Sequence, residues 1–180
     1  MGTDIHMYAE FEEENGAYQA IADGEFWMPR DYDLFAALAG VRGREKIPPK
    51  FPQRGIPANV SADTASHFYL PVMSAERAAA WGVVEYFTPE EARELEAQQR
   101  ASWLPEGTTI PWIASPEGHL TNPGRHSPSW LTAAEVVEAL SHAKYPLAQC
   151  PRELRLLLEY LQKYTAETNR IARIVFWFDS

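Results

Sequence analysis

Residues 4–11 read DIHMYAEF, and their side chains alternate between two unlike sets. The apolar set is Ile5, Met7, Ala9 and Phe11, and the polar set is Asp4, His6, Tyr8 and Glu10. A period of two is typical of a β-strand with one face toward a core. Asn15-Gly16 follows as a turn, and residues 17–21 return as a second strand. The sequence therefore predicts an N-terminal β-hairpin.

The remaining patterns predict helices followed by one closing strand. Helices are predicted over residues 31–38, 74–81, 88–103 and 132–143 and from residue 151 onward, and a strand over 170–178. Two strands, then helices, then a strand indicate an α+β domain rather than alternating βαβ units. We expect an antiparallel sheet built from the N-terminal hairpin and the C-terminal strand, packed with about four to five helices. This sheet would bring Asp179 within reach of Asp4 and His6.

Two proline-rich segments, at about 42–70 and 105–128, lack any regular pattern. Their prolines and glycines disfavour helices and central strands. Long irregular segments inside a compact domain are usually functional or mobile. We expect a single globular domain over residues 1–180 with these two segments as loops.

Size and composition exclude several classes of protein. A chain of 180 residues fits one domain, and its net charge of -9 argues against general binding of nucleic acid or anionic membranes. The single cysteine, Cys150, excludes an intramolecular disulfide and a cysteine-based zinc site. No apolar run approaches the roughly 18 residues of a membrane span, and no signal-peptide pattern precedes Asp4. A cytoplasmic protein is expected.

The polar side of the first strand suggests a metal site. Alternate residues of a strand project to one face, so Asp4 and His6 point the same way, with Glu10 further along. Carboxylates and imidazole are ligands for Zn, Mn or Fe ions. The alternative is a solvated strand face, or a histidine bound to a neighbouring acid.

A second candidate is the segment GRHSPSW at residues 124–130, immediately before the helix predicted from Thr132. Ser127 and Ser129, with the helix N-terminus, could bind an anion, and His126 could be a metal ligand or a general acid or base. The alternative is a capping loop whose serines satisfy turn amides.

Three arginines lie outside the clear helices, namely Arg30, Arg42 and Arg54, and Tyr32 is close to the first of them. In an acidic protein, arginines around irregular loops are candidates for binding a phosphate or carboxylate. Alternatively they pair with nearby acids such as Asp31 and Asp33. No P-loop, G-x-G-x-x-G, H-E-x-x-H or G-x-S-x-G motif occurs, which removes the common nucleotide-binding, zincin and serine hydrolase assignments.

Taken together, these blocks resemble an uncharacterised family of proteins from bacteriophage and bacterial genomes. The matching blocks are GTDIH at 2–6, RDYDLF at 30–35 continuing into LAGVR at 38–42, PQRGIP at 52–57, HSPSWL at 126–131 and VFWFD at 175–179. Members of that family often carry His-Ser-His-Ser in the fourth block, where Pro128 replaces the second histidine here. The resemblance implies a phage or prophage context and a small protein of bacterial cytoplasm, without an activity.

The chemistry of the blocks leads to two main hypotheses. The first is a metal-assisted hydrolase of a small phosphorylated or nucleotide-like substrate. Asp4, His6, His126 and Asp179 would hold a divalent ion (Zn, Mn or Fe), and Glu10 and His126 would be catalytic. Arg30, Tyr32, Arg42, Arg54, Ser127 and Ser129 would bind substrate. The second is a non-catalytic binder of a small anionic or nucleotide signal, as in phage counter-defence. An inhibitor of a host protein partner remains a third option.

Overall fold

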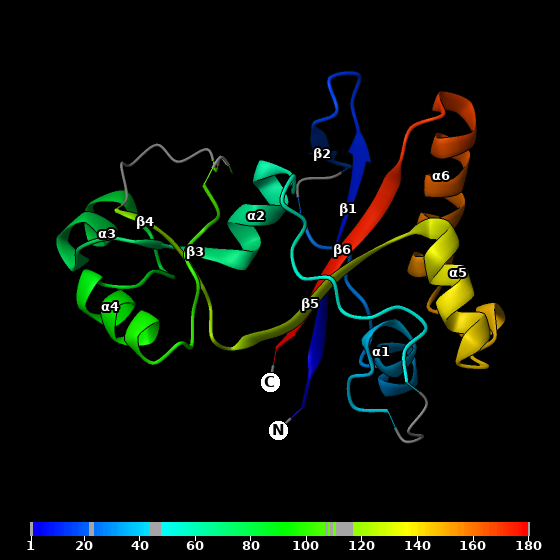
Figure 1. Ribbon diagram of the computed structural model, residues 1–180, viewed down its shortest axis with the longest axis horizontal. Coiled ribbons are helices and arrows are strands. Elements are labelled where there is room, and N and C mark those ends of the chain that lie inside the picture. The colour runs from blue at the N-terminus through cyan, green and yellow to red at the C-terminus, as the bar shows by residue number, and fades with distance from the viewer. Residues whose placement is uncertain are drawn as a thin grey trace. The chain divides into compact units, whose positions relative to one another are not determined.

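The computed structural model describes residues 2–21, 24–43, 48–106, 108, 110 and 117–179 (Figure 1). Contacts divide the chain, expected to form one domain, into two compact units. Unit 1 contains residues 1–61 and 126–180, and unit 2 contains residues 62–125. The two units are described separately below.

Unit 1 contains the four-stranded sheet that the sequence predicts. Its strands are β1 (Asp4–Glu12), β2 (Tyr18–Ala20), β5 (Arg125–Thr132) and β6 (Ala172–Asp179), in the order β2-β1-β6-β5. β1 pairs antiparallel with both β2 and β6. The α+β class, the N-terminal hairpin and the position of the C-terminal strand in the same sheet are confirmed.

Helices pack on one face of this sheet. They are α1 (Tyr32–Ala39), α5 (Ala133–His142), the short 3-10 helix η1 (Leu147–Gln149) and α6 (Arg152–Thr168). Apolar residues of β1 and β6, among them Ile5, Met7, Phe176 and Phe178, share one buried cluster with these helices. Four leucines of α6 are buried there, because residues spaced by three and four positions lie on one side of a helix: Leu154, Leu157, Leu158 and Leu161.

The helix ends follow local sequence signals. The Asp31 carboxylate caps α1 by accepting the amides of Asp33 and Leu34, and Gly40 ends α1 with a φ of 73°. Thr132 and Glu135 form a reciprocal capping box at the start of α5.

The described residues of unit 2 form a two-stranded sheet and three helices. The strands are β3 (Tyr69–Val72) and β4 (Gly118–Thr121), and the helices are α2 (Ala62–Phe68), α3 (Ala75–Trp81) and α4 (Pro89–Ala97). Val72, Ala92 and Leu120 form its small buried cluster. Among the described residues, no helix of the protein has the length and apolar character needed to cross a membrane.

Several segments predicted as loops are regular. α2 and β3 lie within 42–70 and its boundary, and β4 and the start of β5 lie within 105–128. Proline does not prevent strand formation here: Pro128 lies in β5, and Pro71, just beyond the first segment, lies in β3. β5 is at the sheet edge, where a proline is tolerated. Residues 107, 109 and 111–116 of the second segment lie outside the described residues.

α4 is shorter than predicted. It ends at Ala97 rather than near Trp103, and Gln99 has a left-handed φ of 55°. Trp103 instead bridges to Leu120 of β4. Strand pairing therefore competes with helix continuation at this point, which the sequence pattern did not reveal.

Candidate functional site

The ends of β1 and β6 bring the two termini of the chain together. The register pairs Asp4 with Asp179 and His6 with Trp177. Paired residues of antiparallel strands lie on the same face, so these four side chains share one face of the sheet. Figure 1 shows the start of β1 and the end of β6 side by side, next to the N and C labels.

His6 lies between two carboxylates. Its Nδ1 is 3.0 Å from Oε2 of Glu25, and its Nε2 is 3.2 Å from Oδ2 of Asp179. The ring stacks on Trp177, with centroids 5.9 Å apart, and the side chain keeps 25% of its surface exposed. Hydrogen bonding to Glu25 is the main cause that raises the pKa of His6 above its ordinary value; burial opposes this rise and Asp179 adds to it.

Asp4, at the start of β1, forms an ion pair with Arg30. Nε and Nη2 of Arg30 donate to the two carboxylate oxygens of Asp4, at 2.8 and 2.5 Å. The hydrogen bond from Arg30 lowers the pKa of the Asp4 carboxyl. The backbone amide of Asp4 also donates to Oδ1 of Asp179 at 3.2 Å. We call Asp4, His6, Glu25, Arg30 and Asp179 the His6 cluster.

Arg42 and Tyr32, next to the cluster, hold Thr3 in place through hydrogen bonds. The Thr3 side chain is buried and accepts a hydrogen bond from Nε of Arg42 at 2.9 Å, and its amide donates to the Tyr32 hydroxyl. A Cβ at Gly2 would collide with the Arg30 guanidinium, so the glycine permits this arrangement. Arg30, Tyr32 and Arg42, which the sequence predicts as binding residues, are therefore gathered around residues 2–4.

Glu10 has a different environment from the one predicted. It is fully buried, about 13 Å from His6 along β1, and forms an ion pair with Arg173 at 2.7 Å. The Ser61 amide donates to its other oxygen, and Arg173 also donates to Asn59. These contacts occupy both carboxylate oxygens of Glu10.

His126 points to the opposite side of the sheet from His6. Its ring stacks on Phe178, with centroids 6.0 Å apart, and Phe178 belongs to the helix-covered core. Ser127 has a left-handed φ of 51°. In a regular strand, residues five positions apart face opposite sides, yet His126 and Leu131 both face the core. Ser127 therefore interrupts the alternation of β5, as a β-bulge does.

Arg54 and the two serines also lie away from the His6 cluster. The Arg54 guanidinium pairs with Glu135 at 2.7 Å and stacks over Trp130. The Arg54 amide donates to the buried Ser129 hydroxyl, and Ser127 contacts His126. The predicted anion-binding loop is thus part of strand β5 and its interactions.

The spacing of His6 Nε2 and Asp179 Oδ2 is that of a hydrogen-bonded ion pair and is also compatible with two ligands of one divalent ion. Ligands at about 2.1 Å from an ion, separated by 90° to 109°, lie about 3.0 to 3.4 Å apart. The Nε2–Oδ2 distance between His6 and Asp179 is 3.2 Å. In the described part of the chain, no group of three or more His, Cys, Asp or Glu side chains is arranged to hold a metal ion. The described side chains therefore show no metal site by themselves.

Glu25 was not identified from the sequence. It lies in the irregular stretch between β2 and α1, where no periodicity indicates its direction. The same lack of periodicity gives no indication that Trp27, in this stretch, is exposed.

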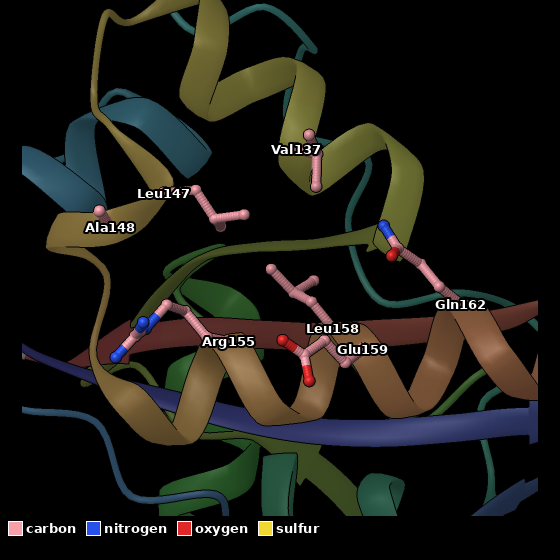
Figure 2. Close-up of a pocket in the computed structure, with 7 residues that line it drawn as sticks. All are labelled: Val137, Leu147, Ala148, Arg155, Leu158, Glu159 and Gln162. Carbon is pink, nitrogen blue, oxygen red and sulfur yellow. The ribbon is translucent and has the colours of Figure 1, made fainter.

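A groove in unit 1 is separate from the His6 cluster. It has a volume of about 290 Å³ and is formed by α5, η1 and α6. Figure 2 shows Leu147, Leu158 and Val137 facing it, with Arg155, Glu159 and Gln162 from α6 around it. It shares no residue with the cluster.

Comparison of the chain with protein-family models, with curated proteins and with solved structures found no match. The function is therefore inferred from the site alone.

Proposed function

We propose that the protein is a metal-assisted hydrolase of a small phosphorylated substrate and that the His6 cluster is its site. The observation that carries this proposal is the position of His6, with Glu25 at Nδ1 and Asp179 at Nε2. A metal-ligating histidine commonly donates its second ring N–H to a carboxylate, which fixes the tautomer and raises the basicity of the ligating nitrogen. Glu25 would have this role.

Nε2 of His6 and the Asp179 carboxylate would then hold the ion. Two protein ligands leave the other coordination positions to water and to phosphate oxygens, as is common for ions that bind together with a phosphorylated substrate. When bound, a divalent ion lowers the pKa of a bound water and polarises a phosphoryl oxygen. We therefore expect weak ion binding by the protein alone and tighter binding in the presence of phosphate.

Arg42 is the best candidate for binding the phosphate. Its side chain is exposed, and Nε donates to the uncharged Thr3 hydroxyl. No hydrogen bond joins its two terminal nitrogens to another described residue, so they could make a bidentate contact with an oxyanion. Arg30, in contrast, is neutralised by Asp4, which suggests that it orients the carboxylates rather than binding substrate. The net charge of -9 favours a small substrate over a phosphate polymer.

Titration calorimetry of EDTA-treated protein with Mn²⁺ or Zn²⁺, with and without inorganic phosphate, tests this proposal. We expect ion binding that phosphate strengthens, that His6→Gln and Asp179→Asn abolish, and that Glu25→Gln weakens about 10- to 100-fold. His126→Gln is the matched control and should leave it unchanged. Release of phosphate from p-nitrophenyl phosphate should depend on the same residues. Ion binding unaffected by His6→Gln, or lost in His126→Gln, contradicts the proposal.

A second candidate is a non-catalytic binder of a small anion. In the described part of the chain two candidate ion ligands, His6 and Asp179, meet, while Arg30 and Arg42 lie close by, and this favours the second candidate. In that case inorganic phosphate would bind without an ion, Arg42→Met would abolish binding, and p-nitrophenyl phosphate would be recovered unchanged.

A further inference from the structure

Trp27 is unusually exposed for its size. It keeps 70% of its surface in solvent, although tryptophan is highly buried on average. Its neighbours in the segment between β2 and α1 are anchored in the core: Met28 is 5% exposed, and Phe26 packs against the same cluster. The exposed ring therefore belongs to a fixed backbone segment.

One backbone hydrogen bond relates this segment to β1: the Phe26 amide donates to the Met7 carbonyl at 2.8 Å. The segment is not a strand, but a chain running antiparallel to β1 from this bond would have residue 27 opposite residue 6 and residue 28 opposite residue 5. The burial of Met28 in the cluster that contains Ile5 agrees with this register.

The side chains on the other side of the segment agree as well. Phe26 and Met28 pack in the core, whereas Glu25 contacts His6. Trp27 lies between Phe26 and Met28, so it projects to the side of Glu25 rather than into the core. The exposed indole is therefore two residues from Glu25, on the same side of the segment as that member of the cluster.

We propose that Trp27 is a stacking platform for a planar ring and that the substrate of the His6 cluster is a nucleotide. This inference rests on the proposed function, which supplies the phosphate end of the ligand. An ion held by His6 and Asp179, together with Arg42, would bind the phosphate, and the indole face would stack on the base. Stacking is tolerant of base identity, because every base has a π-face.

The experiment compares two ligands that differ only by the base, AMP and ribose 5-phosphate, each in the presence of Mn²⁺. Wild-type protein should bind AMP more tightly. Trp27→Leu, which keeps an apolar side chain without a π-face, should weaken AMP binding roughly 5- to 150-fold and leave ribose 5-phosphate unaffected. Trp27→Phe should keep much of the preference. Trp81→Leu, which removes another exposed tryptophan from unit 2, should change neither affinity.

Equal binding of the two ligands by wild type, failure of both to bind, or a preference for AMP that survives Trp27→Leu would overturn the inference. Phosphate release is measured in parallel so that the two proposals can fail separately. Base-dependent binding without ion dependence or phosphate release would refute the hydrolase and keep the role of Trp27. Phosphate release that is identical for both ligands and unchanged in Trp27→Leu would support the hydrolase and refute the role of Trp27.

Discussion

Glu10 and Arg173, 163 residues apart, form an almost completely buried ion pair in the sheet between β1 and β6. The Arg173 guanidinium also lies 3.5 Å from the Tyr18 ring centroid and donates to Asn59. Both carboxylate oxygens of Glu10 accept hydrogen bonds, and all three guanidinium nitrogens of Arg173 donate one. The pair joins the hairpin, the C-terminal strand and the segment around residue 59.

Removing one partner of this pair should be strongly destabilising. Arg173→Met leaves the Glu10 carboxylate buried without its cation, which costs about 3 to 5 kcal/mol. The double variant Glu10→Leu with Arg173→Met should recover part of the loss, because no isolated charge remains. Urea unfolding measures both. Arg170→Met, which breaks an exposed pair with Glu14, is the control and should change little. Equal effects of Arg173→Met and Arg170→Met would contradict this account.

Gly2→Ala should alter the His6 cluster without unfolding the protein. The new methyl group would occupy the position of the Arg30 guanidinium, which is the far end of a flexible side chain and can move away. Asp4 would then lose the hydrogen bonds that lower its pKa, so its carboxyl pKa should rise. NMR titration of the Asp4 carboxyl carbon measures this shift. An unchanged Asp4 pKa would show that the ion pair between Arg30 and Asp4 does not require a glycine at position 2.

Stability of the ion-free protein should depend on pH through His6. The folded-state pKa of His6 is raised above its ordinary value, chiefly by Glu25. Protonated His6 therefore stabilises the fold at pH values below about 6.5, and this contribution is lost as pH rises through the folded pKa. The difference in unfolding free energy between wild type and His6→Gln, measured in EDTA from pH 5 to 9, should shrink with rising pH. A difference that grows with pH would contradict the assigned direction.

Cys150 should be unreactive in the native protein. Its side chain is 4% exposed, and burial, with a smaller effect of Asp31, raises the pKa of the thiol to about 11. Because the thiolate is the reactive form, labelling by DTNB at pH 8 should be slow natively and rapid in urea. Rapid stoichiometric labelling without denaturant would show that the thiol is accessible.

The stability of variants at Ser127 should depend on how well the new residue tolerates a left-handed backbone. Its φ of 51° is readily adopted by glycine, whereas a β-branched residue is strained there. Ser127→Gly should be near neutral, and Ser127→Val should destabilise the fold by about 1 to 2 kcal/mol. Thermal unfolding distinguishes the two. A neutral valine variant would mean that β5 can straighten at this position.

The sequence by itself determined the local features of this protein. The alternation in residues 4–11 predicted β1 and its two faces, since strand side chains project alternately. Asp31, Thr88 and Thr132 predicted the starts of three helices, because a side-chain oxygen can satisfy the free amides of a first helical turn. These signals depend on a few neighbouring residues and need no knowledge of the rest of the chain.

Tertiary structure alone decided which of the candidate residues meet. Asp179 reaches His6 through the pairing of β6 with β1. His126 instead lies on the core face, because the left-handed backbone at Ser127 interrupts the alternation of side chains along β5. Glu25 reaches His6 from an irregular segment, and Glu10 is taken up by Arg173. Register, bulges and loop paths are set by packing across the whole sheet, and shifting a strand by one residue reverses which face each side chain occupies.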